Sequence, residues 1–315
     1  MIQLSLKDLF EVGAHFGHQT HRWNPKMRPY IYGVRHGIHI IDLQKSVQML
    51  QKAVESVIEI VAEGGDVLFV GTKKQARDVV AEEATRCHMH YVNNRWMGGT
   101  LTNFKTIKSS IDKLVEMEEK QSKGDYAALT KKERLGIDRM ITKLSASLGG
   151  IRLLGGSPAV LVVIDPKLER IAIHEGRHLG IPIVAMTDTN CDPTVVDYPV
   201  PSNDDAARSI HYIVQKIADA ALLGLEQREV RIRNRVDESR ARAAEEGETQ
   251  RADRRGPNKP RVGKGTAPKA YVRRAEVAEE GASTDQGAYS ATVAVEVPAE
   301  SMAAGAEVGS VPAAE

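Results

Sequence analysis

The sequence predicts a doubly wound α/β protein with a mainly parallel sheet, from three apolar runs and the helical patterns that follow them. The runs are apolar throughout and lie at 67–70, 159–164 and 181–185. Continuous apolar runs are typical of strands that are buried on both faces of a parallel sheet. Turn-forming or capping residues follow each run, and helical patterns come next at 73–84, 168–179 and 204–225. This alternation of strand and helix predicts the fold class.

Two further helical patterns interrupt the alternation after the first apolar run. Apolar residues step by three or four over 104–114 and again over 137–151, which is typical of helices that pack along a seam. The polar stretch 118–126 separates them. The sequence therefore predicts a protruding antiparallel coiled-coil helical hairpin. The alternative is that both helices pack on the sheet.

These patterns divide the chain into an α/β sandwich domain, an insertion and two extensions. The sandwich takes 1–102 and 152–227, and the hairpin insertion takes 103–151. The extension 228–274 holds fifteen Lys/Arg against seven Asp/Glu, and the tail 275–315 holds none against eight, so the net charge of +1 hides a basic and an acidic block. Alternating charges are compatible with a solvated helix over 228–255, and the low-complexity acidic tail is predicted to be disordered.

Composition excludes several classes of protein. The apolar runs are too short to span a bilayer, and residues 1–10 lack the pattern of a signal peptide. Two cysteines make neither a disulfide framework nor a four-ligand zinc site, which fits a reducing, cytoplasmic setting. The sequence also lacks a nucleophile elbow or a known catalytic cysteine signature, so a catalytic interpretation has no anchor.

Two segments without carboxylates predict a nucleic-acid surface. They lie between Glu11 and Asp42 and between Glu83 and Asp112. The candidate phosphate contacts within them are Arg22, Lys26, Arg28, Arg35, Arg95, Lys105 and Lys108. Cations without neighbouring carboxylates favour contact with a polyanion. Trp23 and Trp96 lie in the same segments, and we expect them to anchor loops rather than to stack on bases. The alternative is chance clustering, with the tryptophans in the core.

Two glycine loops are candidate anion sites. Gly98 and Gly99 precede a predicted helix that Thr102 or Asn103 could cap, and a helix N-terminus favours phosphate. Gly71 is followed by Lys73 and Lys74, which we expect to contact RNA backbone. Neither loop has the spacing of a dinucleotide fingerprint or of a P-loop.

Histidines and aspartates offer a candidate metal site. His15, His18 and His21 step by three, but nearby glycines and Pro25 disfavour a regular helix. Asp188 follows the third apolar run, and Asp204 and Asp205 open the last predicted helix. With His18 they could hold a structural divalent ion, Zn²⁺ or Mg²⁺. Capping of the helix by Asp204 or Asp205 is the preferred interpretation.

Several of these motifs together resemble a known family. The segments 13–20, 22–27 and 37–43, then 69–73 and 94–103, then 188–193 and 201–206 closely resemble, in order, the motifs of ribosomal protein S2 of the bacterial small subunit. The resemblance covers about residues 3–226. Two departures are Ser202, where glycine is usual, and the long tail, whose role the resemblance does not cover.

The resemblance implies a flavodoxin-like α/β/α sandwich, a structural role in translation, and a place near the head–body junction of the small subunit. It implies binding to 16S rRNA and to neighbouring small-subunit proteins, including the mRNA-binding ribosomal protein S1, with no membrane and no small-molecule substrate. No cofactor is required, and the metal that some members hold would map to His18, Asp188 and Asp204 or Asp205. The alternatives are a nucleotide-binding Rossmann-like enzyme and a free RNA-binding regulator.

Overall fold

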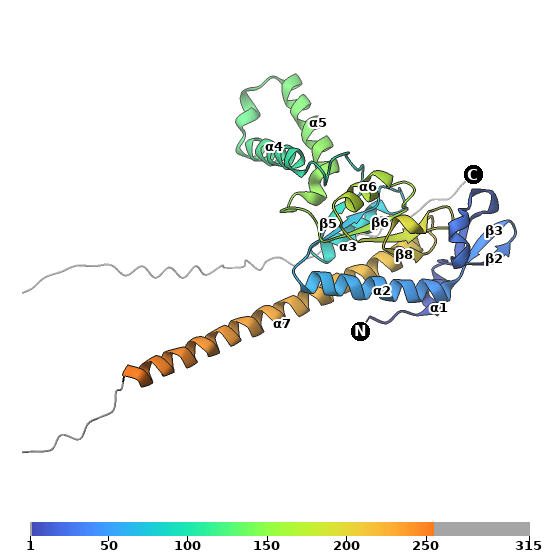
Figure 1. Cartoon of the computed structure of the whole chain (residues 1–315). Coiled ribbons are helices and arrows are strands. Elements are labelled where there is room, and N and C mark those ends of the chain that lie inside the picture. The colour runs from blue at the N-terminus through green and yellow to red at the C-terminus, as the bar shows by residue number, and fades with distance from the viewer. Residues whose placement is uncertain (1, 255–315) are drawn as a thin grey trace, which may run out of the picture. The chain divides into compact units, whose positions relative to one another are not determined.

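The centre of the molecule is a five-stranded parallel sheet (Figure 1). The computed structural model of the chain describes residues 2–254. The strands lie in the order β5-β4-β6-β7-β8, and every neighbouring pair is parallel. They are β4 (Val67–Val70), β5 (His90–Val92), β6 (Val160–Ile164), β7 (Ile183–Thr187) and β8 (Tyr198–Pro201). From β4 the chain adds β5 on one side and then returns to add β6, β7 and β8 on the other, so the strand order reverses between β4 and β6. The predicted doubly wound α/β class is confirmed.

Helices cover both faces of the sheet, which gives the three layers. Alternate strand residues point to opposite faces, so Phe69 and Val162 enter one core while Leu68 and Leu161 enter the other. The first core is shared with the helices α2 (Leu43–Ala62), α3 (Arg77–Arg86) and α7 (Ala207–Arg254). The second core is shared with α6 (Arg170–His178) and with the root of a helical hairpin.

Close contact between α2 and α7 depends on Gly224. A Cβ atom at this position would lie 2.7 Å from the Cβ of Val61 and 3.0 Å from the carbonyl oxygen of Ile58. Real Cβ atoms do not approach so closely, so only glycine lets the two backbones meet there. Asp42 fixes the start of α2, because its carboxylate accepts a hydrogen bond from the amide of Gln44 at 3.1 Å.

A second, antiparallel sheet precedes the sandwich and was not predicted. It consists of β1 (Phe16–Gln19), β2 (Ile31–Arg35) and β3 (Ile38–Ile41), in the order β1-β3-β2. The short helix α1 (Leu6–Glu11) lies before it. Thr189, just after β7, ties this sheet to the sandwich, because its hydroxyl accepts from the amide of His18 at 2.9 Å and its carbonyl accepts from the amide of Asn24 at 2.8 Å.

The predicted hairpin consists of α4 (Phe104–Lys123) and α5 (Lys131–Leu148), which project from the sandwich (Figure 1). Gly124 ends α4 in a left-handed conformation with φ 80°, and Thr130 and Glu133 form a capping box at the start of α5. The buried Ile107, Ile111 and Leu114 of α4 belong to the same core as the second face of the sheet. The predicted α5 seam is mostly half-buried, and coiled-coil packing along the hairpin remains a prediction.

Helix α7 runs without interruption through the predicted boundary at 227/228 and ends at Arg254. Part of the predicted basic extension is therefore helical, and the rest of it and the acidic tail lie outside the described residues. Short 3-10 turns complete the description, at η1 (Thr20–Arg22), η2 (Pro25–Tyr30), η3 (Asp125–Ala128), η4 (Gly149–Ile151) and η5 (Pro193–Val195). Within residues 2–254, no helix is both long and apolar enough to cross a membrane.

Candidate nucleic-acid interface and metal-ligand cluster

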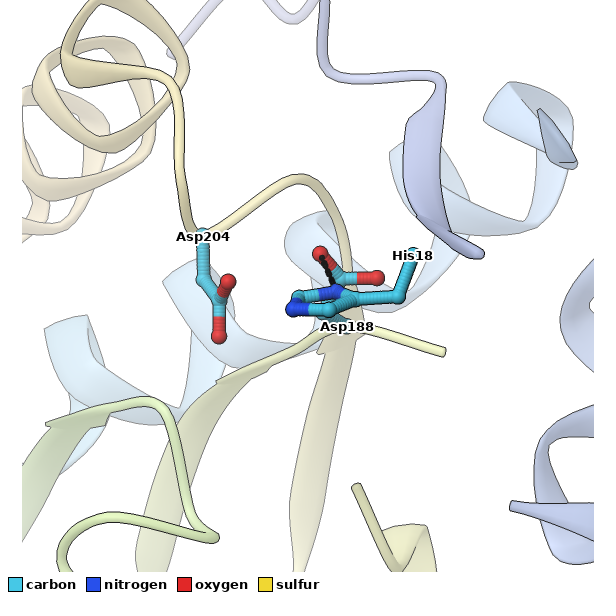
Figure 2. Close-up of side chains that lie close together, drawn as sticks. All are labelled: His18, Asp188 and Asp204. Carbon is cyan, nitrogen blue, oxygen red and sulfur yellow. Dashed lines mark ion pairs between the residues drawn. The ribbon is translucent and has the colours of Figure 1, made fainter. Parts of the chain in front are cut away.

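Charged side chains gather at the carboxyl ends of the parallel strands, where ligands bind in open α/β sheets. Asp188 follows β7, Asp204 follows β8, and the antiparallel sheet brings His18 over both (Figure 2). The Nδ1 atom of His18 lies 2.9 Å from Oδ2 of Asp188. One ligand atom from each of the three residues lies within 4.8 Å of the others. We call these three residues the His–Asp cluster.

The His–Asp cluster contains buried polar atoms that lack hydrogen-bond partners. They are Nδ1 of His18, Oδ2 of Asp188 and Oδ2 of Asp204. The first two are close enough for an ion pair, but their orientation does not meet hydrogen-bond geometry. Buried polar atoms are costly unless a proton or an ion satisfies them. The cluster thus has the donor set and the unmet demand of a small cation site.

Lys73 supplies part of the missing positive charge. Its Nζ atom lies 2.7 Å from Oδ1 of Asp204 and 2.5 Å from Oδ1 of Asp205. Burial, with the nearby carboxylates of Asp188 and Asp165, raises the pKa of Asp204 to about 7 despite this contact. The contact with Asp188 raises the pKa of His18. The sequence assigned Lys73 to RNA backbone, but the structure places its ammonium in an internal ion pair.

The predicted helix cap is wrong: within the described residues, neither Asp204 nor Asp205 accepts a hydrogen bond from an amide of α7. Just before the helix, the carbonyl oxygen of the Asn203 side chain accepts from the amides of Asp205 and Ala206 at 3.0 and 3.3 Å. This frees the carboxylate of Asp204 to face the cluster. Asp205 is half exposed at its side chain, and its Oδ2 lies 3.5 Å from Nε2 of His18.

A second buried set overlaps the cluster. One ligand atom each from Asp165, Cys191 and Asp204 lie within 4.8 Å of one another, and all three residues are buried. Sequence reasoning missed Asp165 and Cys191. The signal for Asp165 was present, because it directly follows β6, as Asp188 follows β7.

The loop that follows β4 is bound by a carboxylate from the segment that follows β6. The Oε1 atom of Glu169 accepts from the amide of Thr72 at 3.0 Å and from its hydroxyl at 2.5 Å. Thr72 follows Gly71, where a nucleotide phosphate would need the backbone amide. Burial raises the pKa of the Glu169 carboxyl, although the two bonds from Thr72 oppose the rise.

The second glycine loop is likewise occupied from inside. The carboxylate of Glu175, on α6, accepts from Nε1 of Trp96 at 3.1 Å and from the amide of Gly99 at 2.8 Å. It also accepts from the amides of Leu101 and Thr102 at 2.9 and 3.2 Å. Burial alone would raise the pKa of Glu175, but these bonds outweigh it and lower the pKa.

Two expectations for this loop are corrected as a result. These amides do not form a free phosphate site, because they already bind Glu175. Neither Thr102 nor Asn103 caps α4, since Asn103 precedes the helix but its side chain makes no capping hydrogen bond. The loop needs Gly99, which has φ 85°, to turn its amide toward the carboxylate. Glu175 was not predicted from the sequence. The only clue in a single sequence is its position on the side of α6 that faces the core.

The tryptophans differ in their surroundings. Trp96 is buried and is held by Glu175, as a loop anchor would be. Trp23 is half-buried, and its ring lies 5.0 Å from the ring of the buried His39. Gly98 lies beside Gly99 at the exposed turn of the loop.

Seven of the nine predicted basic contacts are exposed and form no ion pair with any described residue: Arg22, Arg28, Arg35, Lys74, Arg95, Lys105 and Lys108. The other two are Lys73 and Lys26, whose Nζ lies 2.6 Å from Oδ2 of Asp192. Exposed cations without carboxylate partners remain available for contact with an external anion.

At the carboxyl edge of the parallel sheet, carboxylates of the chain itself bind amides of both glycine loops. The chain belongs to the ribosomal protein S2 family, whose model matches residues 9–224. Members of this family are structural ribosomal proteins and not enzymes. The match ends inside α7, so the last thirty described residues lie outside it.

The chain matches most of the length of each of its relatives. The chain is 54% identical over 228 residues to the small ribosomal subunit protein uS2 of Maridesulfovibrio salexigens, which covers 72% of this chain and 88% of the relative. It is 50% identical over 247 residues to the small ribosomal subunit protein uS2 of Geotalea uraniireducens, covering 78% and 96%. The same protein of Dehalococcoides mccartyi is 53% identical over 218 residues, covering 69% and 89%.

Proposed function

We propose that this chain is a structural constituent of the small ribosomal subunit that binds 16S rRNA and neighbouring ribosomal proteins in the cytoplasm. The observation that carries the proposal is the set of seven exposed, unpaired cations on and beside the two carboxylate-free segments. Their phosphate contacts would release counterions and give salt-dependent binding. The names of the relatives, each a small ribosomal subunit protein, support the same assignment.

A position near the head–body junction and a role in docking ribosomal protein S1 are part of the proposal. The hairpin, which projects from the sandwich, would provide the second contact of an elongated scaffold (Figure 1). Its exposed Leu135 and Met140 offer apolar area to a protein partner.

Charge reversal tests the rRNA surface. We expect Arg22→Glu with Arg95→Glu to reduce retention of the full chain on salt-washed small subunits by roughly tenfold or more, since several phosphate contacts are lost or made repulsive. Lys52→Glu with Arg170→Glu is the matched control, because it makes the same charge change at exposed helix positions outside both segments. Equal retention of the two variants would contradict the proposed surface.

The His–Asp cluster is proposed to hold a structural divalent cation, Zn²⁺ or Mg²⁺. His18, Asp188 and Asp204 would be its ligands, because each has a buried atom without a hydrogen-bond partner. The ion would neutralise carboxylates that burial otherwise pushes toward protonation. An imidazole beside two carboxylates suits Zn²⁺, whereas Mg²⁺ prefers oxygen ligands and retained waters.

Elemental analysis of the purified full chain tests the metal. We expect close to one equivalent of a divalent ion, lost in Asp188→Asn and retained in Asp192→Asn, which changes an aspartate outside the cluster. Metal content that is unaffected by Asp188→Asn would refute the assignment.

The nucleotide-dependent enzyme is disfavoured, because Glu169 already occupies the amide of Thr72 that a phosphate would use.

A further inference from the structure

A polar cavity of about 410 Å³ lies where the carboxyl end of β5 meets the first turn of α3 and the last turn of α5. Its volume falls at the lower end of the range for small-ligand pockets. The cavity is separate from the His–Asp cluster and from the Glu175 contacts. It is lined by Arg77, Asp78, Tyr91, Asn93, Asn94, Ser145, Ala146, Ser147 and Gly150.

Amides and hydroxyls dominate the polar lining of this cavity. The arginine at 77 and the aspartate at 78 cancel in charge. Two side chains are fixed in place: the Arg77 Nε donates to the carbonyl of Thr72 at 3.0 Å, and the Asn93 Nδ2 donates to the carbonyl of Arg77 at 3.2 Å. The side chains of Asn94, Ser145 and Ser147 make no hydrogen bond to any residue in the described part of the chain. They therefore leave both donors and acceptors free for a ligand.

Tyr91 gives the cavity an aromatic wall. A Cβ atom at Gly150 would lie 2.7 and 2.8 Å from two carbon atoms of the Tyr91 ring and 2.2 Å from the Tyr91 carbonyl oxygen. Glycine at 150 therefore lets the ring lie directly against the backbone that follows α5. Tyr91 is half-buried: it packs against the first core and also lines the cavity.

The lining selects among classes of ligand. A phosphate or a free anion needs excess positive charge, which Asp78 removes. A divalent cation needs several carboxylates, and the cavity has one. A nucleobase is planar and uncharged, and its edges carry both donors and acceptors, which side-chain amides and hydroxyls complement. Unpaired RNA bases also stack on aromatic side chains.

We propose that this cavity binds one unpaired base of ribosomal RNA, with Asn94 and Ser147 at its edge and Tyr91 as the aromatic wall. The inference rests on the proposed rRNA-binding function and adds a base-specific contact to it. The neighbouring Arg95 is exposed and lies in the same loop. It would hold the phosphate backbone at the mouth of the cavity while the base enters.

The test uses small subunits that lack this chain, to which the full-length chain or the double variant Asn94→Ala, Ser147→Ala is added back. Chemical probing of the Watson–Crick edges of the rRNA is then compared between the two particles. We expect the natural chain to protect at least one unpaired base. The double variant should lose that protection and bind roughly tenfold more weakly, with the slope of log affinity against log salt unchanged.

Arg22→Ala is the matched control, because Arg22 is an exposed cation that does not line the cavity, so its loss should lower the salt slope by about one while leaving the base protected. Thermal unfolding of each variant checks that the fold is retained. No difference in base protection between the natural chain and the double variant would overturn the inference. A lowered salt slope in the double variant would also overturn the inference, because it would indicate a phosphate site. Failure of the natural chain itself to join the particles would instead refute the proposed function.

Discussion

Glu175 is predicted to be one of the largest single contributors to the stability of the sandwich outside the apolar core. Its carboxylate is 5% exposed and accepts from Trp96, Gly99, Leu101 and Thr102, so it joins α6 to the loop that leads into the hairpin. Glu175→Ala removes the acceptor and leaves these donors without partners. Loss of a buried, charged hydrogen-bonding group of this kind costs about 3–5 kcal/mol.

For a domain of this size, about 3–5 kcal/mol corresponds to a fall in Tm of roughly 6–20 °C. The assay is urea and thermal unfolding of the full chain at pH 7, with Glu82→Gln as the control, since Glu82 is an exposed glutamate on α3. The control should change the free energy of unfolding by less than about 0.5 kcal/mol. A loss below about 1 kcal/mol in Glu175→Ala would refute the reasoning.

The same site has a defined pH dependence. The folded-state pKa of Glu175 lies below the ordinary value of 4.5, so its carboxylate stabilises the fold above pH 4.5. That stabilisation is lost as the pH falls through the lowered pKa. The difference in unfolding free energy between the natural chain and Glu175→Gln should therefore be constant near neutrality and narrow in acid. A difference that widens below pH 4 would contradict the assignment.

Three other predictions concern packing, capping and the thiols. Gly224→Ala should destabilise the fold by about 1–3 kcal/mol in urea unfolding, because the new methyl group meets Val61 at 2.7 Å; an unchanged midpoint would contradict the close approach of α2 and α7. Thr130→Ala removes the capping box of α5 and should cost about 1 kcal/mol, seen as faster amide exchange in its first turn but not in α2. Cys87 and Cys191 are buried, and burial raises the pKa of Cys87 to about 11 and that of Cys191 further, so neither should react with a thiol reagent at pH 8 before unfolding; rapid reaction of the folded chain would show that the burial is wrong.

The central strands were predictable because each is buried on both faces and therefore consists of a continuous run of apolar residues. Continuous apolar runs marked β4, β6 and β7, although β7 begins at Ile183, two residues later than predicted. The edge strands were missed for physical reasons. The edge strand β5 has only three residues, and β8 contains two prolines, which are tolerated at a sheet edge but do not resemble a strand. The antiparallel sheet lacks clean alternation, because its register is irregular.

The candidate site was predictable only in part. Asp188 and Asp204 were predicted because residues that follow parallel strands meet at one edge of the sheet. His18 was predicted from its place in the histidine-rich segment near the N-terminus. Glu169 and Glu175 were missed because a glutamate in or beside a helix is usually exposed to solvent, and the sequence alone does not show that tertiary packing buries these two. Both carboxylates occupy glycine-loop amides that the sequence offered to phosphate. The ion pair of Lys73 was missed for a related reason, because Asp204 lies 131 residues further along the chain.

Sedimentation tests the central claim most directly. Cell extract containing the tagged full-length chain is resolved on a sucrose gradient, and the chain is quantified across the fractions relative to other small-subunit proteins. A structural constituent should appear in the small-subunit fraction at close to one copy per particle and should remain there after a moderate salt wash. A chain that stays at the top of the gradient, free of ribosomal particles, would contradict the claim.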